Sequence, residues 1–425
     1  MMKKRHGILM AACWALLSAG AEQCEIPVTV ANRTAVDWSA GETAVIGLGR
    51  LPVPGSFAPA ALTVTVGGET VPSQYDDLNF SGTADAADEI CFRLPAIPRG
   101  GAVQAVIRFG SPTTEKSEAA FTLKKLGTFI KAECGFFTAV FDRESGTLNT
   151  VYLNAPRQVL CKSVLHSALY SFVGGFYSPD AGKTVWKDRL MSWEFSGKLK
   201  GFSAGPVRAV VAFDDIGLRN RTGALDFDDR YAITSFLYPE GRIVERFTID
   251  PGKKQDSACQ LVFRHLPPAL PEQTPFRRLT AYDAAGKPLQ SVEIPERGEF
   301  RYARPAGAVL AGIGVEADSC GVSFLVNPGS FEFRRNVRNS TDSAAGWNYN
   351  GSYREAQSAF RSDPWSGEEF NIGMCASEWP SRLAAGEAAL ESCVYLWRDK
   401  NRTGYVAGVL QGGPLAAESI TVNQP

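Results

Sequence analysis

Short runs of alternating apolar and polar residues follow one another along most of the chain. Residues 26–30 and 62–66 alternate strictly, and the second run ends at Gly67-Gly68. Residues 207–213 are rich in apolar and β-branched side chains. Alternation with a period of two is typical of strands with one buried face, and glycines between such runs are typical of turns. Beyond the first 21 residues we find no convincing amphipathic helix, so the pattern predicts an all-β protein.

Two segments have the pattern of a β-hairpin. Residues 136–141 and 147–153 flank a polar stretch that ends in glycine, and residues 229–238 and 242–249 flank Pro239-Glu240-Gly241. Strands joined by such short connections pair in the antiparallel sense. Many short strands at regular spacing favour β-sandwiches or barrels.

The first 21 residues have the three parts of a secretory signal. Basic residues occupy positions 3–5, an apolar run covers 8–17, and small residues stand at 19–21. This order is typical of a cleaved signal peptide. The apolar run is much shorter than the about 20 residues that a membrane-spanning helix needs. We therefore expect residues 1–21 to be a signal peptide. We expect the mature protein to be exported, to the periplasm or outside the cell, with no membrane span.

A polar, turn-rich stretch at residues 111–118 divides the rest of the chain. Domains of about 100 to 150 residues are common, and large β-sandwiches are longer. We expect a small N-terminal β-sandwich or β-barrel domain over residues 22–125. One large β-sandwich is expected over residues 126–425.

Charge and cysteine spacing exclude two classes of site. Lys and Arg number 44, and Asp and Glu number 45, so the chain lacks the basic excess of a nucleic-acid-binding protein. The cysteines beyond residue 21 are widely spaced, which argues against a zinc site: Cys24, Cys91, Cys134, Cys161, Cys259, Cys320, Cys375 and Cys393. In an exported protein they either pair as disulfides or remain buried thiols, and the sequence leaves both open.

Three pairs of segments, taken in order, carry a resemblance to a known group of proteins: residues 71–82 with 88–89, 137–142 with 205–211, and 378–387 with 394–396. The first pair resembles the N-terminal β-module of secreted bacterial exo-rhamnogalacturonan-lyase-like proteins and related domains. The other two resemble the central and closing strands of galactose-mutarotase-like β-supersandwiches. The resemblance implies that the large domain is such a supersandwich and that the chain handles carbohydrate. Several lyases of this kind add an α/α-toroid domain, for which 425 residues leave no room.

An acidic loop has nearly the spacing of a calcium-binding loop. Counting from Asp77 as place one, oxygen-bearing side chains stand at places one, three, five, nine and twelve: Asp77, Asn79, Ser81, Asp85 and Asp88. Converging oxygens, with Gly82 for the sharp turn, suit Ca²⁺. The last residue is Asp rather than the usual Glu, and no flanking helices are apparent. The alternative is a turn whose Asp and Asn side chains bond their own backbone.

Aromatic and basic residues gather after His166, among them Tyr170, Tyr177, Trp186 and Arg189. Aromatic rings stack on sugars, and a guanidinium pairs with the carboxylate of a uronic acid. In β-elimination on a uronic acid, a base removes the C5 proton while the carboxylate is neutralised. We assign the base to His166 with Tyr170 or Tyr177, the carboxylate partner to Arg189, and substrate stacking to Trp186. The alternative is that these rings belong to core strands.

The second predicted hairpin carries another candidate substrate-binding residue, Arg230. If the chain turns at residues 239–241, we expect Arg230 and its neighbours to lie nearly opposite Glu245 and Arg246. Such a cluster is either part of a site or a surface ion pair between strands.

A long segment rich in Gly, Ser and Asn carries further candidates: Trp347, Tyr349, Tyr353 and Arg354. Long loops on a rigid sandwich often carry function. We expect these residues to form a sugar-stacking edge, and the alternative is a mobile loop.

Two functions fit these observations. The first is a polysaccharide lyase-like or related sugar-active enzyme that acts on glycans containing uronic acid. The second is a non-catalytic glycan-binding or surface structural β-sandwich protein. No pair of carboxylates stands out for glycosidase chemistry, and the chain has no serine-hydrolase, P-loop or dinucleotide motif. The expected partner is a polysaccharide or oligosaccharide, with no cofactor apart from the Ca²⁺ considered above.

Overall fold

The computed structural model describes most of the chain beyond residue 23. The described residues are 24–53, 61–110, 118–162, 171–178, 183–191, 195–218, 230–250, 257–266, 276–283, 285–293, 312–326, 361–363, 367–369, 372–375, 388–399, 406–410 and 419–423. The predicted signal peptide, residues 1–21, lies outside them.

By its internal contacts the chain forms two compact units. The first comprises Met1–Glu118, Gly205–Val207 and Gly413–Pro425, and the second comprises Ala119–Ala204 and Arg208–Gly412. The first boundary lies a few residues before the expected one. The C-terminal residues, which we expected in the large domain, group with the first unit because the last strand of the chain pairs with the first.

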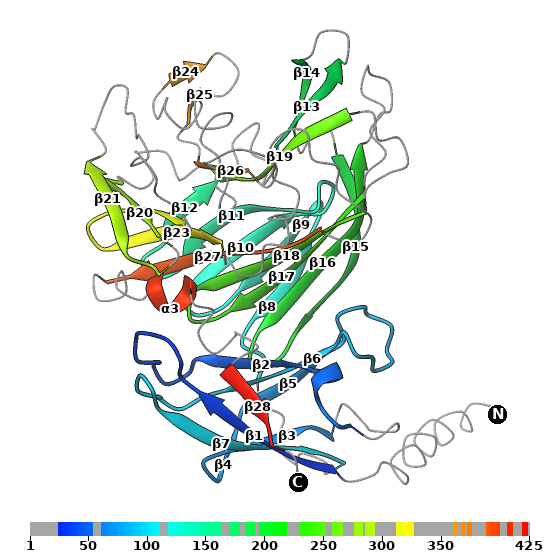
Figure 1. Ribbon diagram of the computed structural model, residues 1–425, viewed down its shortest axis with the longest axis vertical. Helices are drawn as coiled ribbons and strands as arrows, with labels where there is room; N and C mark the ends of the chain where they lie inside the picture. The colour runs from blue at the N-terminus through cyan, green and yellow to red at the C-terminus, as the bar shows by residue number, and fades with distance from the viewer. Residues whose placement is uncertain are drawn as a thin grey trace, which may run out of the picture. The chain divides into compact units, whose positions relative to one another are not determined.

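Two antiparallel sheets form the first unit (Figure 1). The five-stranded sheet has the order β28-β1-β7-β3-β4, and the three-stranded sheet has the order β2-β6-β5. Their strands are β1 (Cys24–Ala31), β2 (Thr43–Gly47), β3 (Thr63–Val66), β4 (Glu69–Val71), β5 (Ser73–Asp76), β6 (Glu89–Arg93), β7 (Ala102–Phe109) and β28 (Ile420–Val422). The short 3-10 helix η1 (Leu48–Arg50) follows β2.

The alternation read from the sequence sets the core of this unit. In β1 the side chains of Ile26, Val28 and Val30 are buried, and those between them are only partly so. These residues pack in one apolar cluster with Trp38 and Phe92. Burial of such side chains is the main force that stabilises a sandwich of this size.

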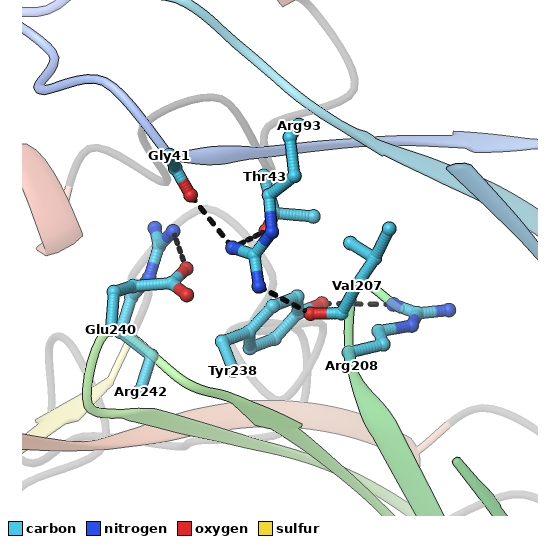
Figure 2. Close-up of polar contacts among 8 residues, drawn as sticks. All are labelled: Gly41, Thr43, Arg93, Val207, Arg208, Tyr238, Glu240 and Arg242. Atoms are coloured by element: carbon cyan, nitrogen blue, oxygen red, sulfur yellow. Dashed lines mark hydrogen bonds and ion pairs between the residues drawn. The ribbon is translucent and has the colours of Figure 1, made fainter. Parts of the chain in front are cut away.

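Side chains of the first unit form hydrogen bonds with the backbone N–H and the backbone carbonyl of Val207. The Val207 N–H donates to Gln74 Oε1 at 3.1 Å, and the Val207 carbonyl accepts from Arg93 Nη2 at 2.7 Å. Arg93 Nη1 also donates to the Gly41 carbonyl at 2.6 Å and to the Thr43 hydroxyl at 2.8 Å (Figure 2). Both backbone polar groups of Val207 are therefore hydrogen-bonded within the unit.

Two large antiparallel sheets make up the body of the second unit (Figure 1). The nine-stranded sheet has the order β15-β16-β17-β18-β27-β23-β22-β20-β21, and the five-stranded sheet has the order β12-β11-β10-β9-β8. The strands of the nine-stranded sheet are β15 (Phe195–Ala204), β16 (Ala209–Leu218), β17 (Arg230–Tyr238), β18 (Arg242–Asp250), β20 (Arg278–Tyr282), β21 (Pro288–Glu293), β22 (Gly312–Glu316), β23 (Cys320–Val326) and β27 (Ala388–Arg398). Those of the five-stranded sheet are β8 (Thr122–Leu126), β9 (Phe129–Glu133), β10 (Phe137–Asp142), β11 (Thr147–Leu153) and β12 (Gln158–Lys162).

The remaining elements of the second unit are smaller. A four-stranded sheet has the order β14-β13-β19-β26, and β24 pairs with β25. Their bounds are β13 (Ser171–Ser178), β14 (Lys183–Met191), β19 (Ser257–Leu266), β24 (Arg361–Asp363), β25 (Gly367–Glu369) and β26 (Ile372–Cys375). One short helix, α3 (Val406–Leu410), completes the described elements.

One face of the nine-stranded sheet packs on the five-stranded sheet. The register places Leu237, Ile243 and Val394 on this face, and all three are buried. At Gly146, in the turn before β11, a Cβ would lie 3.2 Å from the side chain of Phe213. This approach requires glycine, whose φ of 73° also favours it. We refer to this side of the nine-stranded sheet as the apolar face.

The hairpin of β17 and β18 has the expected strands and turn, but the expected facing of its charged residues was wrong. Arg230 pairs with Asp250, not with Glu245 or Arg246. Glu245 pairs with Ser235 and is buried on the apolar face, where the Ser235 hydroxyl donates to its carboxylate at 3.2 Å. The two strands advance equally from a three-residue turn, so the start of β17 can only meet the end of β18.

The structure confirms the prediction of an all-β protein. The helices named among the described residues are the short η1 and α3. None of the described helices is long and apolar enough to cross a membrane.

Candidate functional site

The second face of the nine-stranded sheet carries rings and guanidinium groups side by side. Residues paired directly across neighbouring strands share a face. The register pairs Arg242 with Tyr238 on one side and with Tyr395 on the other. Phe236 and Arg246 lie on the same face, because each is an even number of residues away along its strand. We call this side, opposite the apolar face, the polar face.

Cations and rings hold one another on the polar face. The Cζ atoms of Arg208 and Arg246 lie 4.3 Å and 4.7 Å from the ring centre of Phe236. Arg208 Nη1 donates to the Tyr238 hydroxyl at 2.8 Å, and Arg242 Cζ lies 5.5 Å from the centre of the Tyr238 ring (Figure 2). A guanidinium within about 6 Å of a ring centre is attracted by the ring quadrupole.

The cluster has a closed end, where Arg208 and Arg242 are buried, and an open end, where Arg246 reaches solvent. Arg208 and Arg242 are 0% and 1% exposed, and Arg242 Nη2 lies 2.6 Å from Glu240 Oε1 (Figure 2). Since a buried charge requires partners, these arginines fix the geometry of the sheet. Arg246 is only half-buried. It can therefore meet a ligand from solvent while Phe236 supports it from below.

Arg230 stands at the open end of the polar face in an ion cluster. Its Nε lies 3.1 Å from Asp215 Oδ1, and Lys198 Nζ lies 2.6 Å from Asp215 Oδ2. The hydrogen bond from Lys198 lowers the pKa of the Asp215 carboxyl, and Asp215 raises the pKa of Lys198 in return. The Arg230 side chain lies over Gly217, where a Cβ would be 2.5 Å from Nη1. This arrangement orients the predicted substrate-binding arginine along the polar face.

The predicted catalytic cluster is described in part. Tyr177 lies on β13, and Trp186 and Arg189 lie on β14, its antiparallel neighbour. The register pairs Arg189 with Val173 and Trp186 with Gly175. These two partners lie four and two residues before Tyr177 on β13. The backbone therefore brings three of the predicted residues to one hairpin. The other candidates lie outside the described residues: His166, Tyr170, Trp347, Tyr349, Tyr353 and Arg354.

The acidic loop between β5 and β6 bonds to its own backbone. The two carboxylate oxygens of Asp77 accept from the Ser81 N–H at 3.2 Å and the Gly82 N–H at 2.6 Å. The Asn79 amide donates to the Asp85 carboxylate. Among the residues that the structure describes, no group of three or more His, Cys, Asp or Glu side chains is placed to hold a metal ion. The Ca²⁺ site stays a prediction.

Asp88 closes the same loop from its other end. Its Oδ1 accepts from the Leu78 N–H at 3.0 Å, and its Oδ2 accepts from the Asp85 N–H at 2.8 Å and from the Tyr75 hydroxyl. Burial, followed by the hydrogen bond to Asp88, raises the pKa of Tyr75. The Asp88 carboxylate thus has a structural role. It fits the alternative interpretation of this loop, a turn whose Asp and Asn side chains bond to its own backbone.

Sequence reasoning missed the closed end of the polar face. Phe236 and Tyr238 stand two apart on one predicted strand, and Arg242 and Arg246 stand four apart on the next. Alternation alone would have placed each pair on one face. Arg208 carries no such signal, because it precedes its strand and its burial depends on neighbours distant in the chain.

Comparisons with known proteins give structural likenesses alone. No protein-family model matches the chain, and no curated protein matches it. A glycosyl hydrolase family 38 protein from Enterococcus faecalis is similar over 98% of this chain and 50% of its own, with 11% identity and a TM-score of 0.49. The chain thus spans about half the length of that protein.

Smaller sugar-related structures are similar to part of the chain. A galactose 1-epimerase from Lactobacillus acidophilus matches 67% of this chain and 100% of its own, with 9% identity and a TM-score of 0.40. A galactose mutarotase-like protein from Clostridium acetobutylicum matches 66% and 98%, with 9% identity and a TM-score of 0.37. Likenesses at this level fix neither a substrate nor a reaction. The resemblance to exo-rhamnogalacturonan-lyase-like proteins stays a prediction.

Proposed function

We propose that the chain is an exported carbohydrate-active protein that binds glycans containing uronic acid on the open end of the polar face. The observation that carries this proposal is the half-buried Arg246, stacked on the ring of Phe236 and sharing a face with Arg230. Phe236 is itself fully buried, so it positions Arg246, and the half-buried guanidinium is the group that suits the carboxylate of a uronic acid.

The spacing of the two arginines favours a polymer over a single sugar. Arg246 pairs with Thr234, four residues along β17 from Arg230. At about 3.3 Å per residue this places the two positions about 13 Å apart along the strand. A chain with carboxylates on several of its sugars can pair with both guanidinium groups at once. Exposed hydroxyls such as that of Thr248 add hydrogen-bonding capacity at the same end.

As an enzyme the protein would act as a polysaccharide lyase. His166, with Tyr170 or Tyr177, would take the C5 proton of the uronic acid. Arg189 would neutralise the carboxylate, and Trp186 would support a neighbouring ring. Trp347, Tyr349, Tyr353 and Arg354 would add a stacking edge. The alternative function is non-catalytic glycan binding, which the arginine and aromatic cluster supports equally well because it requires no base.

Affinity electrophoresis in gels that contain polygalacturonate tests binding. We expect the mature protein to be retarded, and Arg230→Met and Arg246→Met each to weaken binding about threefold to tenfold, the value of one ordinary hydrogen bond. Arg108→Met is the matched control, because Arg108 pairs with Glu25 at 2.7 Å in the first unit. Unretarded wild-type protein, or equal losses in the control, would overturn the proposal.

Absorbance from new unsaturated chain ends separates the two functions. A lyase produces this signal on uronic-acid polysaccharides, and His166→Ala abolishes it without loss of retention in the gel. Retention with no absorbance change across a panel of such polysaccharides assigns the protein to the binding class. Export is tested separately, by the N-terminal sequence of protein recovered outside the cytoplasm, which we expect to begin after residue 21.

A further inference from the structure

Two neighbouring buried polar atoms on the polar face have no hydrogen-bond partner among the described residues. They are Ser323 Oγ on β23 and Trp397 Nε1 on β27, and each residue is 1% exposed. The register pairs Ser323 with Tyr395 and Trp397 with Gly321, which makes Ser323 and Trp397 diagonal neighbours. Diagonal neighbours have Cβ atoms about 7 Å apart. Leaving such an atom unpaired costs free energy, so two of them so close together require an explanation.

Two aromatic rings near these atoms lie against glycines of the sheet. At Gly321 a Cβ would lie 2.3 Å from Cζ2 and 2.8 Å from Nε1 of Trp397. At Gly314 it would lie 2.8 Å from Ser323 Oγ and 3.2 Å from Cε2 of Tyr282. The Trp397 indole therefore lies against the bare backbone of Gly321, and the edge of the Tyr282 ring lies beside Gly314. That is the arrangement of a stacking platform.

A carboxylate stands between the two rings. Glu316 pairs with Gly321 and lies two residues after Gly314, so it is on the same face. It accepts from Arg278 Nε at 2.8 Å and from the Tyr282 hydroxyl at 3.4 Å. The long Tyr282 contact leaves the carboxylate with capacity for a further donor.

Helix α3 covers this part of the polar face with apolar side chains. Val406, Val409 and Leu410 pack on a cluster that includes Tyr282 and Trp397. The helix approaches so closely that a Cβ on Gly286 would lie 2.2 Å from the backbone of Ala407. An apolar cover supplies dispersion contacts to the rings but offers no hydrogen bond to the Ser323 hydroxyl or the indole N–H.

We infer that the surface formed by Tyr282, Glu316, Ser323 and Trp397 is a second carbohydrate site, which binds one neutral sugar unit when α3 moves aside. A sugar hydroxyl can accept from the indole N–H, and another can donate to Glu316 or exchange hydrogen bonds with Ser323. The apolar side of the sugar ring stacks on Trp397. A neutral unit is favoured because Arg278, the cation beside Glu316, already forms an ion pair with that carboxylate and is not needed by a neutral sugar. This site goes beyond the proposed function and uses none of its residues.

Titration with neutral monosaccharides tests the inference. Glucose, galactose and rhamnose are each added at millimolar concentration to the full mature protein, and binding is measured by saturation-transfer NMR and calorimetry. We expect at least one to bind, with Ser323→Ala and Trp397→Phe weakening it fivefold or more. Ser323→Ala removes an unpartnered polar atom, so we expect the fold to be retained or stabilised. Trp397→Phe also leaves a cavity at a buried position, so we expect it to fold with reduced stability. Ser145→Ala is the control, because Ser145 already has hydroxyl and carboxylate partners on the five-stranded sheet.

A variant that weakens the packing of α3 provides a second test of the inference. Val406→Ala removes apolar contact from the cover, so we expect tighter sugar binding, because a larger fraction of the molecules is open. Val151→Ala, at an equally buried position on β11, controls for general destabilisation. Binding seen only with Val406→Ala also supports the inference. It is overturned if no sugar binds either wild type or Val406→Ala, or if Ser323→Ala and Trp397→Phe bind like wild type. These probes are uncharged, so the result is independent of polygalacturonate binding.

Discussion

Replacement of Asn32 tests whether a buried polar network stabilises the first unit. Asn32 is 1% exposed, and its amide donates to the carbonyls of Val36 and Ile97, both at 2.9 Å. Its oxygen accepts from the N–H of Thr34 at 3.0 Å and from the Thr34 hydroxyl at 2.7 Å. The Trp38 indole in turn donates to Thr34 Oγ1 at 3.0 Å. Every polar atom of the Asn32 side chain is therefore used.

The cost of Asn32→Ala follows from which groups keep a partner. Once Asn32 is replaced, the single proton of the Thr34 hydroxyl can go to the Val36 carbonyl, and the Ile97 carbonyl still accepts from the Trp38 N–H. Only the Thr34 N–H is left unpaired, at about 1 to 3 kcal/mol, and two donor bonds are lost at about 1 kcal/mol each. We expect a loss of about 3 to 5 kcal/mol, which lowers the melting temperature of this unit by about 10 °C or more.

Thermal unfolding followed by calorimetry and near-ultraviolet circular dichroism measures this change. Asn149→Ala is the control, because the Asn149 oxygen accepts a single bond, from Thr150 at 2.8 Å, and its loss is expected to cost under about 1 kcal/mol. Asn32→Asp places a carboxylate oxygen against two carbonyl oxygens, so we expect that variant to gain stability as pH falls and the new group is protonated. A loss below about 1 kcal/mol in Asn32→Ala would refute the reasoning.

Two further predictions concern backbone strain and thiol burial. Gly241→Ala places a Cβ 2.4 Å from the Leu396 carbonyl oxygen at a φ of 106°, so we expect a loss of about 3 kcal/mol or more in urea unfolding. Gly135→Ala, where nothing lies within 4 Å, should lose far less, and equal losses contradict the steric argument. Burial raises the pKa of the Cys320 thiol to about 11, so iodoacetamide at pH 8 should modify it only after unfolding, later than the half-buried Cys24. Because the folded thiol keeps its proton, its contribution to stability is complete below about pH 8.5 and is lost as pH rises toward 11. Rapid labelling of native protein contradicts this.

The sequence predicts strands well because their signal is local. The alternation of Ile26, Val28 and Val30 matches their burial in β1, and the turn at residues 239–241 lies where β17 and β18 meet. The facing of Arg230 and Glu245 was misjudged although the turn was correct. Pairing partners had to be counted outward from the turn, and an error of a few residues along one strand moves a charge from the rim to the interior.

The closed end of the polar face could not be found by pattern alone. Arginine is usually exposed, so a sequence gives no reason to bury Arg208 and Arg242. Their burial depends on Phe236, Tyr238 and Glu240, which offer rings and a carboxylate only once the sheet is assembled. The pairing of Ser323 with Tyr395 likewise joins residues far apart in the chain. Such non-local geometry decides which polar atoms are left unpaired.

The pairing of β28 with β1 has a consequence for biosynthesis. Residues 420–422 complete the edge of a sheet whose other strands all lie before residue 110. While the ribosome makes the intervening chain, the free edge of β1 has exposed N–H and C=O groups, which invite pairing with another nascent chain. A chaperone that shields this edge, or slow folding of the first unit until the chain is released, would be needed for good yield. Products truncated before β28 should therefore aggregate.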